Sequence, residues 1–250
     1  MVPPSFITFP IFEQFPNLVC IFSTRYGGVS TGGYASQNMG LNTGETRQIV
    51  LDNRRRFFSE ASIQEKQIAY CDQIHSANIC IAANAGIYRD SDGLITNAKN
   101  LFLAVQTADC FPVFLYSPQD QIVSIIHAGW RGAKAGIIFI ACDTLLNRLD
   151  IPPENLFAAI GPGIRKECFE VGTDVSGNFP DQFVQAHNNP EKRYLDLAGF
   201  IRNTLIQKGI PVGQVEDQEI CTVCDRDRFY SYRRDKQKSG RMMGIIGIRS

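Results

Sequence analysis

Three short apolar runs follow one another in the middle of this 250-residue chain, and they constrain its fold more than any other feature. They are LFLAVQ (101–106), PVFLYS (112–117) and QIVSIIH (121–127), and polar turn residues bound each of them. Such runs predict neighbouring strands. Further strands are predicted over 18–24, 68–75, 78–82 and 155–161, in RFYSYRR (228–234) and in MMGIIGIR (242–249).

Three segments show helical periodicity instead. One begins at Thr43 or Glu45 and runs through 53–61, one covers 132–149, and one covers 194–209 and ends at Gly209. The second carries an apolar stripe of Ile137, Ile140, Ala141, Leu145 and Leu149. Because strands outnumber helices and occur in clusters, the sequence predicts an α+β fold with a mixed sheet. No repeat or linker divides the chain, so we expect a single domain over residues 1–250.

Composition excludes several classes of protein. Lys and Arg together number 25, as do Asp and Glu, and this balance argues against a general nucleic-acid binder. A local basic pocket for a small anion remains compatible with it. No apolar stretch reaches about 18 residues, so no membrane span is expected. The N-terminal segment lacks the basic start of a signal peptide, and the eight cysteines are therefore expected to be reduced in the cytoplasm.

Three residues with metal-binding side chains lie at the ends of the apolar runs: His75, Cys110 and His127. Two imidazoles and one thiolate suit zinc, and three protein ligands leave a fourth position open, as in catalytic zinc sites. With three histidines in all, the chain has too few for the copper centres of a multicopper oxidase. Two other interpretations remain open: a metal-free Cys110–His127 nucleophile–base pair, or plain packing of these residues in the core.

Other reactive residues are less informative. Cys221 and Cys224 form an isolated CxxC pair without a second pair at zinc-finger spacing, which favours packing or a weak thiol site. His187 lies among polar residues and is expected in a solvated loop. Residues 221–250 hold eight Lys or Arg against three Asp. This excess of positive charge is typical of a solvated hairpin or of a surface that attracts phosphate or a nucleotide. In Arg54–Arg56, at least one side chain should face the core.

Several motifs resemble those of the bacterial laccase-domain family, also described as polyphenol oxidases and as purine nucleoside phosphorylases. The matching motifs span most of the chain and include FSTRYGGVSTGGY (22–34), SQNMG (36–40), QIHS (73–76), DGLIT (92–96), TADCFPVFLY (107–116), HAGWRG (127–132), GPGIRKECFEVG (161–172) and CTVCDRDRFYSYRR (221–234). The resemblance implies a sandwich of about four layers (α/β/β/α) and zinc, or else copper, held by His75, Cys110 and His127. It also implies phosphorolysis of adenosine, inosine, guanosine and methylthioadenosine, and deamination of adenosine.

On this basis Arg54 is the first candidate to bind phosphate and Arg131 the second. Asn38 is a candidate for contacting the nucleoside, and Asp109 for orienting a histidine. SQNMG and Ser76 depart from the family's usual pattern but retain Asn38 and His75. The competing functions are a copper-dependent polyphenol oxidase, a metal-free Cys–His hydrolase, and a non-catalytic sensor of nucleotides or cell-wall precursors. The expected partners are purine nucleosides and phosphate, with neither nucleic acid nor membrane.

Overall fold

The structure, a computed structural model, describes residues 3–250. The expected domain and the N-terminal segment both begin with Met1 and Val2, which lie outside the described residues. The strands are β1 (Phe6–Thr8), β2 (Leu18–Ser23), β3 (Ile68–Cys71), β4 (Ile79–Ile81), β5 (Gly86–Tyr88), β6 (Gly93–Thr96), β7 (Phe102–Thr107), β8 (Phe111–Ser117), β9 (Ile122–Ala128), β10 (Phe157–Ile160), β11 (Glu170–Gly172), β12 (Val184–Ala186), β13 (Lys192–Leu195), β14 (Val215–Asp217) and β15 (Met242–Ile248). The α-helices are α1 (Arg47–Glu60), α2 (Trp130–Lys134), α3 (Ile137–Asp143), α4 (Thr173–Ser176), α5 (Leu197–Gln207) and α6 (Tyr232–Asp235).

Two six-stranded sheets pack face to face. Their strand orders are β1-β2-β15-β7-β3-β5 and β14-β10-β8-β9-β6-β4, and each contains both parallel and antiparallel pairs. The core between them combines side chains from both sheets, such as Phe22 and Leu103 with Phe114 and Ile125. At Gly244 of β15 a Cβ atom would lie 2.9 Å from the Phe114 ring, so a glycine there permits the close approach of the sheets.

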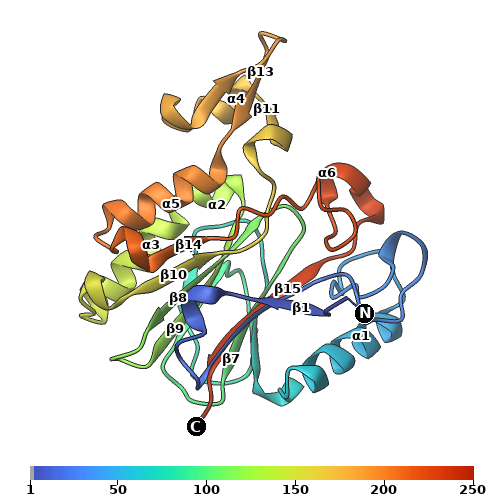
Figure 1. The fold of residues 1–250 in the computed structure, drawn as a ribbon, viewed down its shortest axis with the longest axis vertical. Coiled ribbons are helices and arrows are strands. Elements are labelled where there is room, and N and C mark those ends of the chain that lie inside the picture. Colours follow the sequence, from blue (N-terminus) through green and yellow to red (C-terminus); the bar gives the residue numbers. More distant parts are fainter. Residues whose placement is uncertain (1–2) are drawn as a thin grey trace.

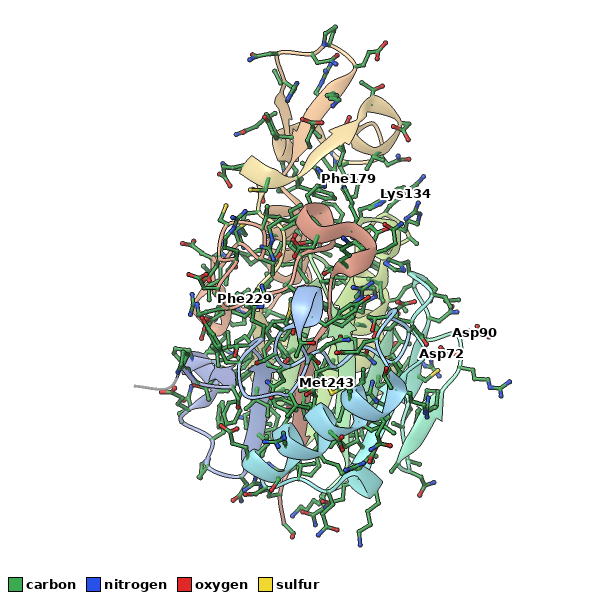
Figure 2. The ribbon with its side chains drawn as sticks, turned by 90° about the vertical axis from the view of Figure 1, so that its right-hand side faces the viewer. Asp72, Asp90, Lys134, Phe179, Phe229 and Met243 are labelled. Atoms are coloured by element: carbon green, nitrogen blue, oxygen red, sulfur yellow. The ribbon has the colours of Figure 1, made fainter. Side chains whose placement is uncertain are left out.

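Helices cover the outer faces of both sheets (Figure 1). Phe57 and Phe58 of α1 pack on the first sheet with Met243, which Figure 2 labels beside that helix. Helices α3 and α5 bury Ile137 and Ile201 on the second sheet. This order of layers, α/β/β/α with mixed sheets, confirms the predicted fold class. Burial on both faces explains why β8, β9 and β15 are largely apolar: every residue of each is buried.

The pairing of β8 with β9 has a direct consequence for the predicted site. The two strands are antiparallel, with Phe111 opposite Ala128 and Pro112 opposite His127. Cys110 immediately precedes β8 and His127 is the penultimate residue of β9, so both lie at the same edge of the sheet. The hairpin thus brings together two residues that are far apart in the sequence.

The predicted helices have different limits in the structure. The first begins at Arg47 instead of Thr43 or Glu45. The segment 132–149 is interrupted at Gly136, whose φ of +85° is left-handed, so α2 and α3 are separate helices. The change of direction buries Ile138 and leaves Ile140, predicted on the apolar stripe, 39% exposed. The segment 194–209 starts as the end of β13, and only then does α5 begin.

Two predicted strands also differ from the structure. RFYSYRR was expected to be a strand, but Phe229 and Tyr230 are buried in an irregular segment and Tyr232 begins α6. The Ser231 hydroxyl accepts a hydrogen bond from the Arg234 N–H and caps that helix. The expected strand 68–75 ends at Cys71, because the backbone turns sharply before His75.

A small third sheet, β11-β13-β12, stands with α4 at one end of the molecule's long axis (Figure 1). Its strands are three or four residues long and half-exposed, so the sequence carried little signal for them. In residues 3–250 we find no helix with the length and hydrophobicity needed to cross a membrane.

Candidate functional site

The side chains of His75, Cys110 and His127 converge at the edge of the second sheet. Their potential ligand atoms all lie within 4.8 Å of one another. The His75 Nε2 atom is 3.9 Å from the Cys110 Sγ atom, and the two imidazole rings meet edge to face with centroids 4.8 Å apart. His127 is buried whereas His75 is exposed, so the His–Cys–His site has a buried side and a side open to solvent.

Asp92 orients the buried histidine. Its Oδ1 atom lies 2.7 Å from His127 Nδ1, and Asp92 is fully buried. A carboxylate here holds the proton on Nδ1, which leaves Nε2 free to act as a ligand or as a base. The sequence analysis predicted this kind of role for Asp109, and that prediction is wrong: the residue that contacts a histidine is Asp92. Its signal was the DGLIT motif, which begins with it.

The same carboxylate also fixes the loop that carries His75. Asp92 accepts hydrogen bonds from the backbone N–H groups of Ile74, His75 and Ser76 and from the Ser76 hydroxyl. His75 itself has a left-handed φ of +61°, a conformation that needs such support in a residue with a side chain. One buried side chain therefore positions both imidazoles.

The electrostatics of the three residues favour a thiolate. Burial raises the pKa of Cys110, but the charge of His127 and hydrogen bonds from His127 and His75 outweigh burial and lower the pKa to about 6. Burial would lower the pKa of His127, yet the Cys110 thiolate and Asp92 raise it to about 9. Cys110 and His127 thus form a thiolate–imidazolium pair at neutral pH when no metal is bound.

This pair predicts an unusual pH profile for the metal-stripped protein. Because the thiolate is the nucleophile, the rate of Cys110 alkylation should rise through a midpoint near pH 6 instead of the ordinary 9.0. Peptide mass spectrometry after brief treatment with iodoacetamide between pH 5 and 9 measures it. In His127→Ala the midpoint should move upward, because the cation is lost. A wild-type midpoint near 9 would contradict the ion pair.

A cavity of about 700 Å³ opens beside these residues. Four basic residues line it, against two acidic ones; they are Arg131, Arg233, Lys236 and Arg241 against Asp72 and Asp109. Asp109 is engaged, since it accepts hydrogen bonds from the Thr222 hydroxyl and the Arg233 backbone N–H. The aromatic part of the lining comes from Trp130, Phe169 and Tyr232. The cavity has the size of a small-molecule site and an excess of positive charge.

Of the three predicted substrate-binding residues, only Arg131 lines this cavity. Arg54 lies outside its lining, where the buried guanidinium donates two hydrogen bonds to the Met39 carbonyl. It is the arginine of the 54–56 cluster that faces the core, as expected, but its position does not fit the predicted role of phosphate ligand. The basic side chains that do line the cavity are those of Arg131, Arg233, Lys236 and Arg241.

Asn38 is also outside the lining and fully buried. Its amide donates to Thr43 and Glu45, and its oxygen accepts from the backbone N–H groups of Gly40 and Arg241. The predicted direct contact with a nucleoside is therefore replaced by a positioning role, because Gly40 and Arg241 do line the cavity.

Two minor expectations are revised as well. His187 is half-buried and pairs with Glu170 across 3.2 Å, so it is not a freely solvated loop residue. Cys221 and Cys224 gain a third neighbour, Cys168, whose distance in sequence hid it.

The residues of the His–Cys–His site fit a metal ion. Two nitrogens and one sulfur can serve as the donors of a catalytic zinc centre. The ring nitrogen of His127 that would not bind the metal, Nδ1, is hydrogen-bonded to the Asp92 carboxylate, as is usual for histidine ligands. At Gly129, which follows β9, a Cβ atom would lie 2.8 Å from the Cys110 sulfur. A glycine there keeps the space between the ligands open.

Comparison with known proteins agrees with this architecture. The purine nucleoside phosphorylase YlmD of Geobacillus stearothermophilus is 32% identical over 251 residues, covering 94% of this chain and 92% of that protein. The purine nucleoside phosphorylase YfiH of Escherichia coli is 30% identical, covering 96% and 97%. The crystal structure of a Bacillus licheniformis hypothetical protein, YfiH, superposes with a TM-score of 0.93 at 32% identity, covering 99% and 97%. Residues 19–249 match the family described as multi-copper polyphenol oxidoreductase laccase, and the chain belongs to that family.

Proposed function

We propose that this protein is a metal-dependent purine nucleoside phosphorylase whose metal is held by His75, Cys110 and His127. The observation that carries the proposal is the position of these three side chains beside a basic cavity of about 700 Å³. The names of the relatives support the same reaction class. We propose adenosine, inosine, guanosine and methylthioadenosine as substrates, together with phosphate.

The chain's own residues supply what phosphorolysis needs. Phosphate attacks the anomeric carbon while the purine leaves, so the enzyme must hold an anion and a nucleoside in line. Arg131 is exposed at the cavity, and its guanidinium carbon lies 4.4 Å from the Trp130 ring centroid, a cation–π contact that favours this position of the side chain. Arg233 and Arg241 add positive charge, and Trp130, Phe169 and Tyr232 offer apolar faces for the base.

Two imidazoles and one thiolate occur as ligands both in zinc sites and in blue-copper sites. We propose zinc because phosphorolysis needs a Lewis acid and transfers no electron. When bound, the metal supplies a Lewis acid that polarises an oxygen in the open coordination position. Asp92 keeps both histidines in place for it. The family description refers to copper-dependent oxidation of polyphenols. Three histidines cannot build several copper centres, so any oxidase activity should be minor.

A second activity, deamination of adenosine, is favoured by the open side of the His–Cys–His site. Deamination needs a group that moves a proton between water and the purine. The cavity carboxylates are Asp72 and Asp109, and Asp109 is held by Thr222 and Arg233. We therefore assign proton transfer to Asp72, which is exposed on the cavity wall.

The thiol-rich composition, with eight free cysteines, fits a reducing compartment such as the cytoplasm.

Product analysis tests the proposal. The zinc-loaded protein is incubated with adenosine, with and without phosphate, and the products are identified by mass spectrometry. Adenine and ribose 1-phosphate formed only with phosphate would establish phosphorolysis, and inosine in either sample would establish deamination. Unchanged adenosine in both samples would refute both activities. Oxidation of a phenol by the copper-loaded protein, with adenosine untouched, would favour the oxidase.

Replacing Arg131 with Ala should weaken the use of phosphate. Loss of one charged contact to an oxyanion removes about 1.5–3 kcal/mol of binding, so KM for phosphate should rise roughly 10- to 100-fold. Deamination, which uses no phosphate, should change much less. Steady-state rates at varied phosphate measure the effect. The control is Arg56→Ala, since Arg56 is exposed on α1 and outside the cavity lining. Equal loss of both activities in Arg131→Ala would argue against a phosphate contact.

A further inference from the structure

A second group of metal-binding side chains lies apart from the His–Cys–His site. Cys168, Cys221 and Cys224, here called the cysteine triad, have sulfur atoms that all lie within 4.8 Å of one another. The sulfurs of Cys168 and Cys224 are 3.3 Å apart. Ligand sulfurs in a tetrahedral zinc site, with Zn–S bonds of about 2.3 Å, are about 3.8 Å apart. The observed spacing suits three thiolates around one ion.

The backbone holds the triad together from two distant segments. The Thr222 N–H donates to the Gly163 carbonyl, and the Gly163 N–H donates to the Ile220 carbonyl, so the two segments pair as a short bridge. Cys168 follows in a tight turn closed by its own N–H to the Arg165 carbonyl. A bridge next to a turn fixes all three Cβ positions without help from a disulfide.

The CxxC segment has the form of a metal-binding knuckle. The Arg234 guanidinium donates to the carbonyls of Thr222 and Val223, which fixes the peptide units between the two cysteines. The two-residue spacing of a CxxC pair is the spacing at which both sulfurs can bind one ion.

We propose that the cysteine triad binds a second, thiophilic metal ion of the zinc class. Soft thiolate ligands select such ions, and the exposure of Cys224 lets solvent provide a fourth ligand. This assignment replaces the sequence-based interpretation of Cys221 and Cys224 as packing or a weak thiol site, which had no third ligand to consider.

The ion would link two segments of the chain that lie beside the cavity. Thr222, inside the knuckle, donates to Asp109, the neighbour of Cys110, and Arg233 donates to the carbonyls of Cys168 and Glu170. Both Asp109 and Arg233 line the cavity. A metal at the triad would therefore hold the 161–172 segment and the 221–235 segment in the positions that shape one cavity wall.

Metal content tests the proposal independently of any activity. Purified under reducing, oxygen-free conditions and loaded with Zn²⁺, the wild type should hold about two ions per chain. Cys110→Ala and the double variant Cys168→Ser/Cys224→Ser should each hold about one, and the combination of all three changes none. Cys80→Ser, at a half-buried cysteine outside both groups, should match the wild type.

Cobalt substitution identifies which ligands bind. Thiolate-to-cobalt absorption grows with the number of thiolates, so Cys110→Ala should absorb about three times as strongly per ion as the double variant. Circular dichroism confirms that each variant is folded. A folded double variant that retains the wild-type metal content would overturn the proposal, as would a Cys168–Cys224 disulfide in the oxygen-free protein. If only the His–Cys–His site failed, the wild type would hold one ion and the double variant none.

Discussion

Cys110→Ala is expected to lose metal binding at the His–Cys–His site and turnover together. The change removes the only sulfur of that site and leaves two imidazoles, His75 exposed and His127 buried. A catalytic metal contributes several kcal/mol to a transition state, so kcat/KM should fall about 10³-fold or more. Zinc content by mass spectrometry and phosphorolysis of adenosine, measured on the same preparation, check both losses.

The metal-free interpretation and the metal-dependent one differ in what zinc removal does to the wild type. A Cys110–His127 nucleophile–base pair would also lose activity in Cys110→Ala, but the wild type would then remain active after complete removal of zinc. Cys142→Ala is the matched control for the loss of a thiol, because Cys142 is a buried residue of α3 that faces the core and lies outside the site. Retained activity in a metal-free Cys110→Ala protein would refute the proposed role of this site.

Asp92→Asn is expected to damage the site without touching a ligand. The Asp92 carboxylate accepts hydrogen bonds from three consecutive N–H groups of the His75 loop and lies against His127 Nδ1. Asn has the same shape, but its NH₂ group would face these donors and could not accept their hydrogen bonds. Zinc affinity should fall about 10- to 100-fold. Unfolding free energy at pH 7 should fall by roughly 2–4 kcal/mol, because buried donors lose a charged acceptor.

The pH dependence of stability gives a readout specific to the charge. Burial raises the pKa of Asp92, but hydrogen bonds from His127 and Ser76 outweigh it and lower the pKa to about 2 from 3.8. A lowered pKa adds stability above the unfolded value, and that stability is lost as the pH falls through the folded value. The wild type should therefore lose roughly 2 kcal/mol more than Asp92→Asn between pH 4 and pH 2.

Chemical denaturation of metal-free protein across this range measures the difference. Asp90→Asn is the control, since Asp90 is an exposed neighbour in the same turn, labelled in Figure 2. An Asp92→Asn protein with wild-type zinc affinity and an unchanged acid profile would show that Asp92 does not organise the site.

The sequence predicted the sheets well and their surroundings less well. Runs such as 112–117 and 121–127 are apolar on both faces because each lies inside a four-layer sandwich, and that burial leaves a strong signal. The 228–234 segment was misread because its aromatic side chains are buried without any strand pairing. The short strands β11, β12 and β13 fell below the length at which alternation is informative.

By itself, the sequence determined the class of the fold and the donor types of the three candidate ligands, because burial pattern and ligand type are local properties of residues. Only the tertiary structure decided which polar residues surround that site. It gave the orienting role to Asp92 instead of Asp109, and it placed Arg54 against the Met39 carbonyl, outside the cavity. It also brought Cys168 to the CxxC pair. The contact of Asp92 with His127 joins residues 35 positions apart, and that of Cys168 with Cys224 joins residues 56 positions apart. No local sequence pattern encodes proximity between residues so distant in the chain.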